Sequence, residues 1–234
     1  MGKGRFVNGA NHVDSVDASS SESLTEMSKY NEIITLPDGH QFIMRNLPDD
    51  LMWSDAGFES CWEQRPDKPH PIFIHGRTVP APRLQQAYGS DYEYTGSKNN
   101  ALPIPHNLWP LLAWGKQQFD SRLNGMLLNW YESPDQYIGA HHDSTKGMFD
   151  GSPIVTISFG ETRIFRLTRW EQRKKVDTFD LSATPGRVVV IPYETNKAWK
   201  HEVVKRRSYV GRRISVTLRA FEVGVLPDDQ YRAQ

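Results

Sequence analysis

Two residues with metal-binding side chains, His141 and Asp143, lie two positions apart in the sequence. On an extended strand, residues i and i+2 project from the same face, so this imidazole and this carboxylate could take adjacent positions on one metal ion. The pair alone does not establish a metal site, because an H-x-D triplet also arises by chance and most histidines are structural. Further ligands have to come from elsewhere in the chain.

The third ligand is best assigned to His201, which opens an expected strand in the second half of the chain. His142 alternates to the opposite face of its strand, and His12 lies in a polar tail. The other histidines precede the strand-rich half: His40, His70, His75 and His106. With His201 added, the set becomes the 2-His-1-carboxylate triad of non-haem Fe(II) oxygenases, which leaves one side of the ion open.

A strict alternation of polar and apolar side chains runs through residues 213–219. The polar face carries Arg213, Ser215, Thr217 and Arg219. A solvent-facing strand would show the same pattern. However, Asn129 and Tyr131 also lie two apart, on a strand that leads to the H-x-D pair. Arginine forks bind carboxylates bidentately, so these residues beside a metal site predict a binding cavity for a small dicarboxylate.

Eight short strands separated by polar turns are expected to position these residues. Their ranges are 126–132, 137–143, 153–159, 162–167, 176–181, 188–191, 201–204 and 214–221. Two amphipathic helices should precede them, one capped by Asp49 or Asp50 and one over 107–123. The pattern predicts a mainly β (α+β) fold. We expect a double-stranded β-helix, or jelly roll, with two flanking helices outside its larger sheet and an N-terminal lid region.

Composition bounds the rest of the chain. Residues 1–28 are rich in Ser, Gly, Asn and Asp and are expected to be a disordered tail. Cys61 is the only cysteine, so no internal disulfide can form and a reducing compartment is expected. No apolar run approaches the roughly 20 residues of a membrane span. We therefore expect a cytoplasmic protein, or a nuclear one in a eukaryote, and a monomer. Basic residues dominate 163–213 although the whole chain is neutral, which indicates either a basic face or solvated loops.

Taken together, these motifs resemble the AlkB family of Fe(II)/2-oxoglutarate dioxygenases, and among them the DNA-repair demethylases. That family's pattern is N-x-Y, H-x-D, a distal His and R-x-N/S-x-T-x-R, and each part occurs here in that order. The resemblance covers roughly residues 72–221. It implies one dioxygenase domain over 29–234, with helices and a substrate lid at 29–124 and a jelly-roll core at 125–222.

Specific roles follow from the resemblance. Fe(II) would be held by His141, Asp143 and His201. The distal carboxylate of 2-oxoglutarate would pair with Arg213, helped by Tyr131 and Ser215, and the chelating end would be held by Arg219 and Asn129. O2 would be the third reactant. Residues implied for the substrate side are Arg83, Tyr88, Tyr92, Tyr94 and Thr145.

The implied activity is oxidative demethylation of N-alkylated bases in DNA or RNA, with release of formaldehyde, succinate and CO2. Tyr92 or Tyr94 would stack on an unstacked base at the cavity mouth, and the basic 163–213 segment would hold phosphates. Family members that act on methylated bases commonly carry an acid just beyond H-x-D, where this chain has Thr145. Two alternatives therefore stay open: a hydroxylase of a small molecule or a protein side chain, and a non-catalytic β-barrel binding module.

Overall fold

The computed structural model describes residues 32–74, 76–94 and 97–222, so the expected tail at 1–28 lies outside the described residues. The first strands are β1 (Glu32–Thr35), β2 (Gln41–Asn46), β3 (Pro71–Ile74), β4 (Arg77–Pro80), β5 (Leu84–Tyr88), β6 (Tyr92–Tyr94) and β7 (Ser97–Asn99). The later ones are β8 (Gly125–Tyr131), β9 (Ile138–His141), β10 (Ile154–Gly160), β11 (Arg163–Glu171), β12 (Lys174–Ala183), β13 (Arg187–Ile191), β14 (Trp199–Val203) and β15 (Arg213–Arg219). The helices are α2 (Asp55–Glu63), α3 (Trp109–Gln118) and α4 (Tyr193–Ala198), with 3-10 turns at Asp49–Leu51 and His106–Leu108.

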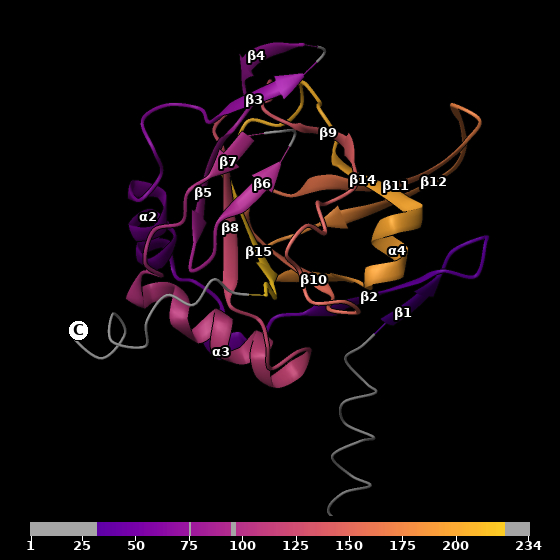
Figure 1. The fold of residues 1–234 in the computed structure, drawn as a ribbon. Coiled ribbons are helices and arrows are strands. Elements are labelled where there is room, and N and C mark those ends of the chain that lie inside the picture. The colour runs from indigo at the N-terminus through magenta and orange to yellow at the C-terminus, as the bar shows by residue number, and fades with distance from the viewer. Residues whose placement is uncertain (1–31, 75, 95–96, 223–234) are drawn as a thin grey trace, which may run out of the picture. The chain divides into compact units, whose positions relative to one another are not determined.

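Two antiparallel sheets form the body of this fold (Figure 1). The larger has seven strands in the order β1-β2-β13-β10-β15-β8-β5, and the smaller has four in the order β12-β11-β14-β9. Strands β8 to β15 match the eight expected strands in order. Four of them, β8, β10, β13 and β15, lie in the larger sheet, and β9, β11, β12 and β14 form the smaller one, so the chain crosses repeatedly between the sheets as in a jelly roll. The expected fold class is confirmed. Two further hairpins, β3–β4 and β6–β7, form separate two-stranded sheets.

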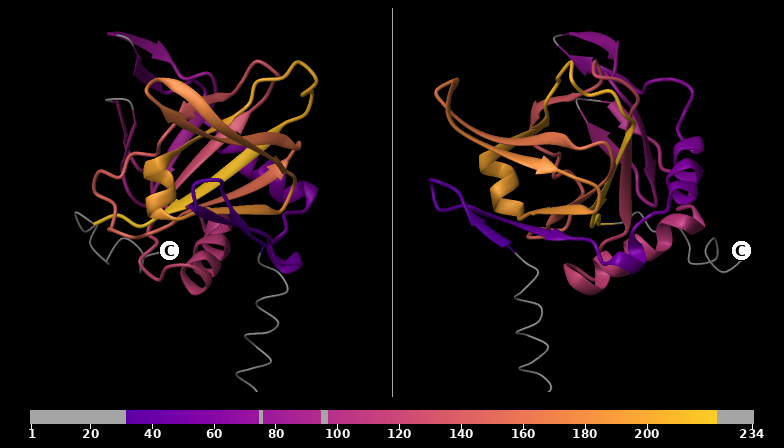
Figure 2. Two further views of the ribbon diagram at one scale, coloured as in Figure 1. Left: turned by 90° about the vertical axis from the view of Figure 1, so that its right-hand side faces the viewer. Right: turned by 180° about the vertical axis from the view of Figure 1, so that it is seen from behind.

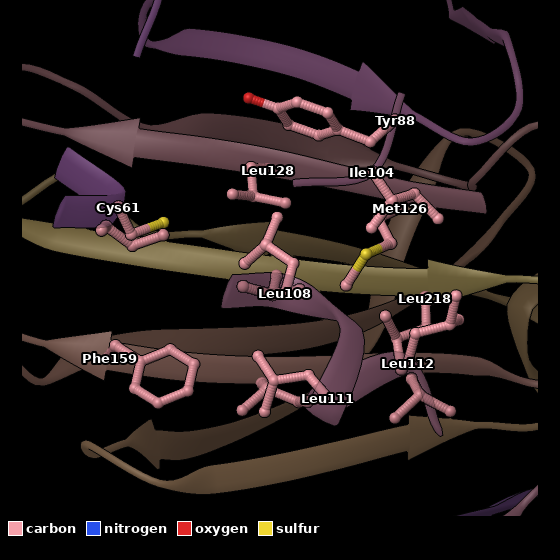
Figure 3. Packing of buried hydrophobic residues seen from close by; sticks show 14 of the residues in the cluster. Cys61, Tyr88, Ile104, Leu108, Leu111, Leu112, Met126, Leu128, Phe159 and Leu218 are labelled. Atoms are coloured by element: carbon pink, nitrogen blue, oxygen red, sulfur yellow. The ribbon is translucent and has the colours of Figure 1, made fainter. Parts of the chain in front are cut away.

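Apolar side chains pack on both faces of the seven-stranded sheet. Helices α2 and α3 lie on the face turned away from the four-stranded sheet (Figures 1 and 2), as the sequence predicted. Their buried residues belong to one cluster with Ile214, Val216 and Leu218, the apolar face of β15. Figure 3 shows part of this cluster, including Leu218. A second cluster fills the space between the sheets, with Leu127, Phe165 and Trp199 among its members. Burial of each such side chain contributes about 1.5–3 kcal/mol, which fixes the sheet between its two layers.

The helices differ from expectation at their ends. Helix α2 begins at Asp55 and not after Asp49, because the Ser54 hydroxyl accepts a hydrogen bond from the Gly57 amide at 3.2 Å and caps it. Helix α3 is shorter than the expected range of 107–123, and the six-residue α4 was not expected. Among the described residues, no helix is long and apolar enough to cross a membrane.

The burial of Cys61 gives a first testable prediction. Its side chain is fully buried in α2, and this burial raises the pKa of the thiol to about 12. Because the thiolate is the nucleophile, the native protein should resist iodoacetamide at mildly alkaline pH and react only after unfolding in guanidinium. Intact-mass spectrometry measures the adduct. Rapid stoichiometric modification of the folded protein would contradict this packing.

Candidate metal centre

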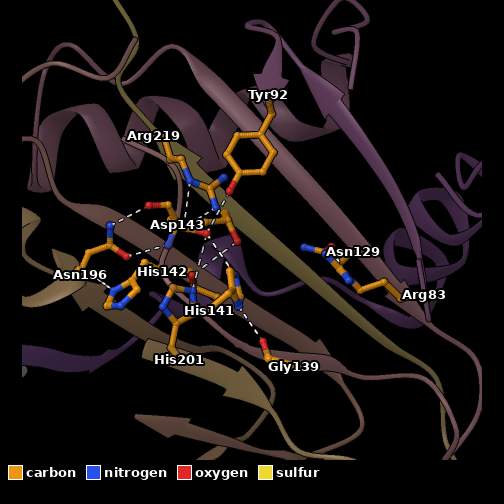
Figure 4. Close-up of polar contacts among 12 residues, drawn as sticks. Arg83, Tyr92, Asn129, Gly139, His141, His142, Asp143, Asn196, His201 and Arg219 are labelled. Carbon is orange, nitrogen blue, oxygen red and sulfur yellow. Dashed lines mark hydrogen bonds and ion pairs between the residues drawn. The ribbon is translucent and has the colours of Figure 1, made fainter. Parts of the chain in front are cut away.

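The structure brings His141, Asp143 and His201 together inside the jelly roll (Figure 4). One ligand atom from each lies within 4.8 Å of the others. Asp143 Oδ1 is 3.3 Å from His141 Nε2 and 3.7 Å from His201 Nε2. Ligands about 2.1 Å from an ion in adjacent octahedral positions lie about 3 Å apart, so two nitrogens and one oxygen in this arrangement fit a ferrous ion.

The geometry of the H-x-D pair differs from the expected one. Strand β9 ends at His141, so Asp143 lies in the following loop and does not share a strand face with the histidine. Asn196 in α4 positions the loop: its side chain accepts from the Asp143 amide at 2.9 Å and donates to the Asp143 carbonyl at 3.1 Å. Asn196 is fully buried, and the sequence carried no signal for this role because the two residues lie 53 positions apart.

Asp143 is held as a carboxylate. Burial alone would raise its pKa, but the charge of Arg219 and hydrogen bonds from His141 and His201 outweigh burial and keep the pKa of Asp143 well below its usual value. Arg219 Nη2 and Nε lie 2.5 and 3.1 Å from Oδ2. The carboxylate therefore presents Oδ1 to the histidines while Oδ2 is bound by the guanidinium.

The surroundings of the two histidines orient their rings and favour the neutral form of His141. Burial, followed by the charge of His201, lowers the pKa of His141. His141 Nδ1 donates to the Gly139 carbonyl at 2.9 Å, which turns Nε2 toward Asp143. The His201 ring lies 5.5 Å from the ring of Phe165, nearly parallel to it, and its buried Nδ1 has no hydrogen-bond partner among the described residues. A neutral imidazole nitrogen is the form that binds metal ions.

A cavity opens beside these three residues between the two sheets. Its wall includes nine of the residues predicted from the sequence: Arg83, Tyr92, Asn129, Tyr131, His141, Asp143, His201, Ser215 and Arg219. Thr217, from the same face of β15, also lines it, as the alternation implied. Thr156 and Phe165 also line the cavity, and no periodicity in the sequence singled them out.

Arg213 lies beneath this wall and has unsatisfied donors. Its side chain is fully buried, its guanidinium lies 5.0 Å from the Tyr131 ring centre, and Nη2 donates to Ser158 at 2.9 Å. Nε and Nη1 have no partner among the described residues, and burial lowers the pKa of the group. A buried guanidinium with two open donors has the chemistry to bind an anion, and the distal carboxylate of 2-oxoglutarate is the anion predicted for it from the sequence.

The residues predicted for substrate contact separate into three groups. Arg83 reaches the cavity and donates to Asn129 Oδ1 at 2.7 Å. Tyr88 is not brought to the site: it shares a face of β5 with Leu84 and packs in the helix-side core. Thr145 is half-buried and does not line the cavity, while the Tyr94 side chain lies outside what the structure describes.

The lysines and arginines of 163–213, which were expected to hold phosphates at the cavity mouth, are not among the residues that line the cavity. Arg163 is fully buried, with the ring centre of Tyr209 4.6 Å from its guanidinium. Several others pair with carboxylates: Arg166 with Asp180, Arg169 with Asp177, Lys205 with Asp135 and Arg212 with Glu59. Ion pairs across strands and loops thus engage these four cations, whereas Arg173, Lys174, Lys175, Arg206 and Arg207 are exposed on the surface.

Comparisons with known proteins agree with this geometry. Residues 53–219 match the family model described as the 2OG-Fe(II) oxygenase superfamily. The chain is 27% identical over 63% of its length to the DNA oxidative demethylase ALKBH2 of Homo sapiens, and 28% identical over 76% to the alpha-ketoglutarate-dependent dioxygenase alkB homolog 3 of Rattus norvegicus. The matches span 60% and 62% of these relatives' own lengths.

A solved structure titled "The structure of OsALKBH1" matches with a TM-score of 0.49 and 13% identity, covering 81% of this chain and 100% of that one. The family model covers more than half of the chain, and it includes all three candidate iron ligands and the whole of β15. The chain therefore belongs to the 2OG-Fe(II) oxygenase superfamily, and its similarity to relatives named as alkB homologues supports the resemblance to the AlkB family found in its motifs.

Proposed function

We propose that this protein is an Fe(II)- and 2-oxoglutarate-dependent oxidative demethylase of N-alkylated bases in DNA or RNA. The observation that carries the proposal is the set of His141, Asp143 and His201 in the wall of one cavity, with the buried cation Arg213 two residues before Ser215 of the same wall. Relatives named as DNA oxidative demethylases support the substrate class.

Each residue would have a defined task. His141, Asp143 and His201 would hold Fe(II), and Arg213 would bind the distal carboxylate of 2-oxoglutarate, with Ser215 and Tyr131 beside it. When bound, iron, 2-oxoglutarate and O2 supply the oxidising chemistry that hydroxylates an N-methyl group, after which formaldehyde leaves and succinate and CO2 remain. Apolar and polar walls of the cavity would exclude bulk water from the reacting groups.

A specific observation keeps a second candidate open, a hydroxylase of a small molecule or a protein side chain. Three basic residues of 163–213, Arg166, Arg169 and Lys205, are paired with carboxylates. Thr145 stands where an acid commonly contacts the base edge. Protein–nucleic acid affinity depends mainly on cations that neutralise phosphates. A chain of zero net charge is compatible with a substrate that carries no phosphate backbone.

Incubation with methylated oligonucleotides tests the proposal. With Fe(II), ascorbate and 2-oxoglutarate, we expect formaldehyde and succinate in a ratio near one from DNA or RNA that carries N-methylated bases, and no formaldehyde from the unmethylated strand. Succinate without formaldehyde from any methylated strand would favour the second candidate. Absence of succinate under all conditions would leave only a non-catalytic binding module.

A further inference from the structure

The hydroxyl of Tyr92 contacts the metal-facing oxygen of Asp143. It donates to Oδ1 at 3.1 Å, and Oδ1 is the same atom that faces the Nε2 atoms of His141 and His201 (Figure 4). Arg219 binds the other oxygen, Oδ2. The carboxylate is thus held at both of its oxygens, by a guanidinium from β15 and by a phenol from β6.

The ring of Tyr92 is not placed as a stacking platform. Its side chain is only 3% exposed, and the guanidinium of Arg219 covers one ring face at 4.4 Å from the centre. A base at the cavity mouth would need an accessible ring face. The stacking role expected for Tyr92 therefore does not agree with its position, whereas a contact to the metal ligand does.

Tyr92 also belongs to a different part of the fold from the ligands. Strand β6 pairs with β7 in a two-stranded sheet that is separate from both jelly-roll sheets. A second contact joins β6 to the loop after Asp143, the ion pair of Glu93 with Lys146 at 2.7 Å. That ion pair is largely exposed, and exposed ion pairs contribute little to stability. The buried hydrogen bond of Tyr92 is the stronger of these two links.

We propose that Tyr92 is a positioning residue of the metal site, which orients Asp143 and thereby couples the β6–β7 hairpin to metal binding. The inference rests on the proposed function only in taking the three residues as metal ligands. Hydrogen-bond partners of metal ligands fix ligand orientation, and their loss typically weakens metal binding by about 10–100-fold. By thermodynamic reciprocity, a bound metal stabilises the hairpin to the same extent that the hairpin stabilises the metal.

Metal affinity tests this role without turnover. We expect Tyr92→Phe to bind Mn2+ in the presence of 2-oxoglutarate about ten-fold more weakly than the wild type by titration calorimetry, and to alter the visible absorption of the Co2+ form. Glu93→Gln is the matched control, because it removes the exposed contact of the same strand and leaves Asp143 untouched. That variant should stay within about two-fold of the wild type. Equal affinities for Tyr92→Phe and the wild type, or equal losses in both variants, would overturn the proposal.

Hydrogen exchange in the wild-type protein gives a second readout that does not depend on a variant folding. Amides of β6 and β7 should exchange more slowly once Mn2+ and 2-oxoglutarate are bound, and unchanged exchange would contradict the coupling. The two proposals fail in different ways. Normal Mn2+ affinity without formaldehyde release removes only the demethylase assignment, and a wild type that binds no Mn2+ removes both.

Discussion

Replacement of Asp143 by alanine is expected to abolish 2-oxoglutarate turnover. The change removes the one anionic ligand of the candidate triad. Loss of a hydrogen-bond partner of a metal ligand typically lowers metal affinity or activity by about 10–100-fold, and loss of the ligand itself should lower them at least as much. We therefore expect succinate formation to fall by more than about 100-fold with saturating iron. Succinate measured by mass spectrometry at matched protein concentration is the readout. Retention of wild-type turnover would show that the iron is held elsewhere.

The same substitution should also destabilise the fold, because Asp143 neutralises a buried cation. Arg219 is 3% exposed and lies 2.5 Å from the carboxylate. Removal of one partner of a buried ion pair typically costs about 3–5 kcal/mol, since the other charge is left unpaired. Asp143→Asn is the matched control, because it keeps an acceptor oxygen and the shape of the side chain. Guanidinium unfolding should rank the stabilities as wild type, Asp143→Asn, Asp143→Ala.

Replacement of Arg213 by methionine is expected to raise the KM for 2-oxoglutarate by about 100-fold, because truncation of one member of a buried charge pair costs about 2–5 kcal/mol. Arg213→Lys keeps the charge but loses the planar fork, so its KM for 2-oxoglutarate should lie between those of the wild type and of Arg213→Met. Steady-state succinate formation over a range of 2-oxoglutarate concentrations gives these constants. An unchanged KM in the methionine variant would mean that the cosubstrate sits elsewhere.

In the absence of cosubstrate, replacement of Arg213 should not destabilise the fold, in contrast to replacement of Asp143. The wild-type side chain is fully buried with Nε and Nη1 unpartnered among the described residues, so its burial is costly until an anion arrives. Arg213→Met should therefore unfold at an unchanged or higher guanidinium concentration than the wild type. Addition of 2-oxoglutarate with Mn2+ should raise the Tm of the wild type and leave that of the variant nearly unchanged.

The sequence by itself determined the features that depend on short-range periodicity. Alternation with period two predicted the apolar and polar faces of β15, and the structure places Ile214, Val216 and Leu218 against the helices while Ser215, Thr217 and Arg219 face the cavity. Successive strands with polar turns predicted the jelly roll for the same reason. Tyr88 could also have been placed correctly, because it lies four residues after the buried Leu84 on one strand face.

Only the tertiary structure decided the features that join segments distant in sequence. Asp143 lies beyond its strand, and its position depends on Asn196, 53 residues away, and on Tyr92, 51 residues away. The sequence could not show whether Arg166 and Arg169 are free to bind phosphates. The pairing of β11 with β12 places acidic partners beside both of them. A residue's type and spacing fix what chemistry it can do, whereas its partner, burial and protonation state depend on loops and sheet pairings that local periodicity does not encode.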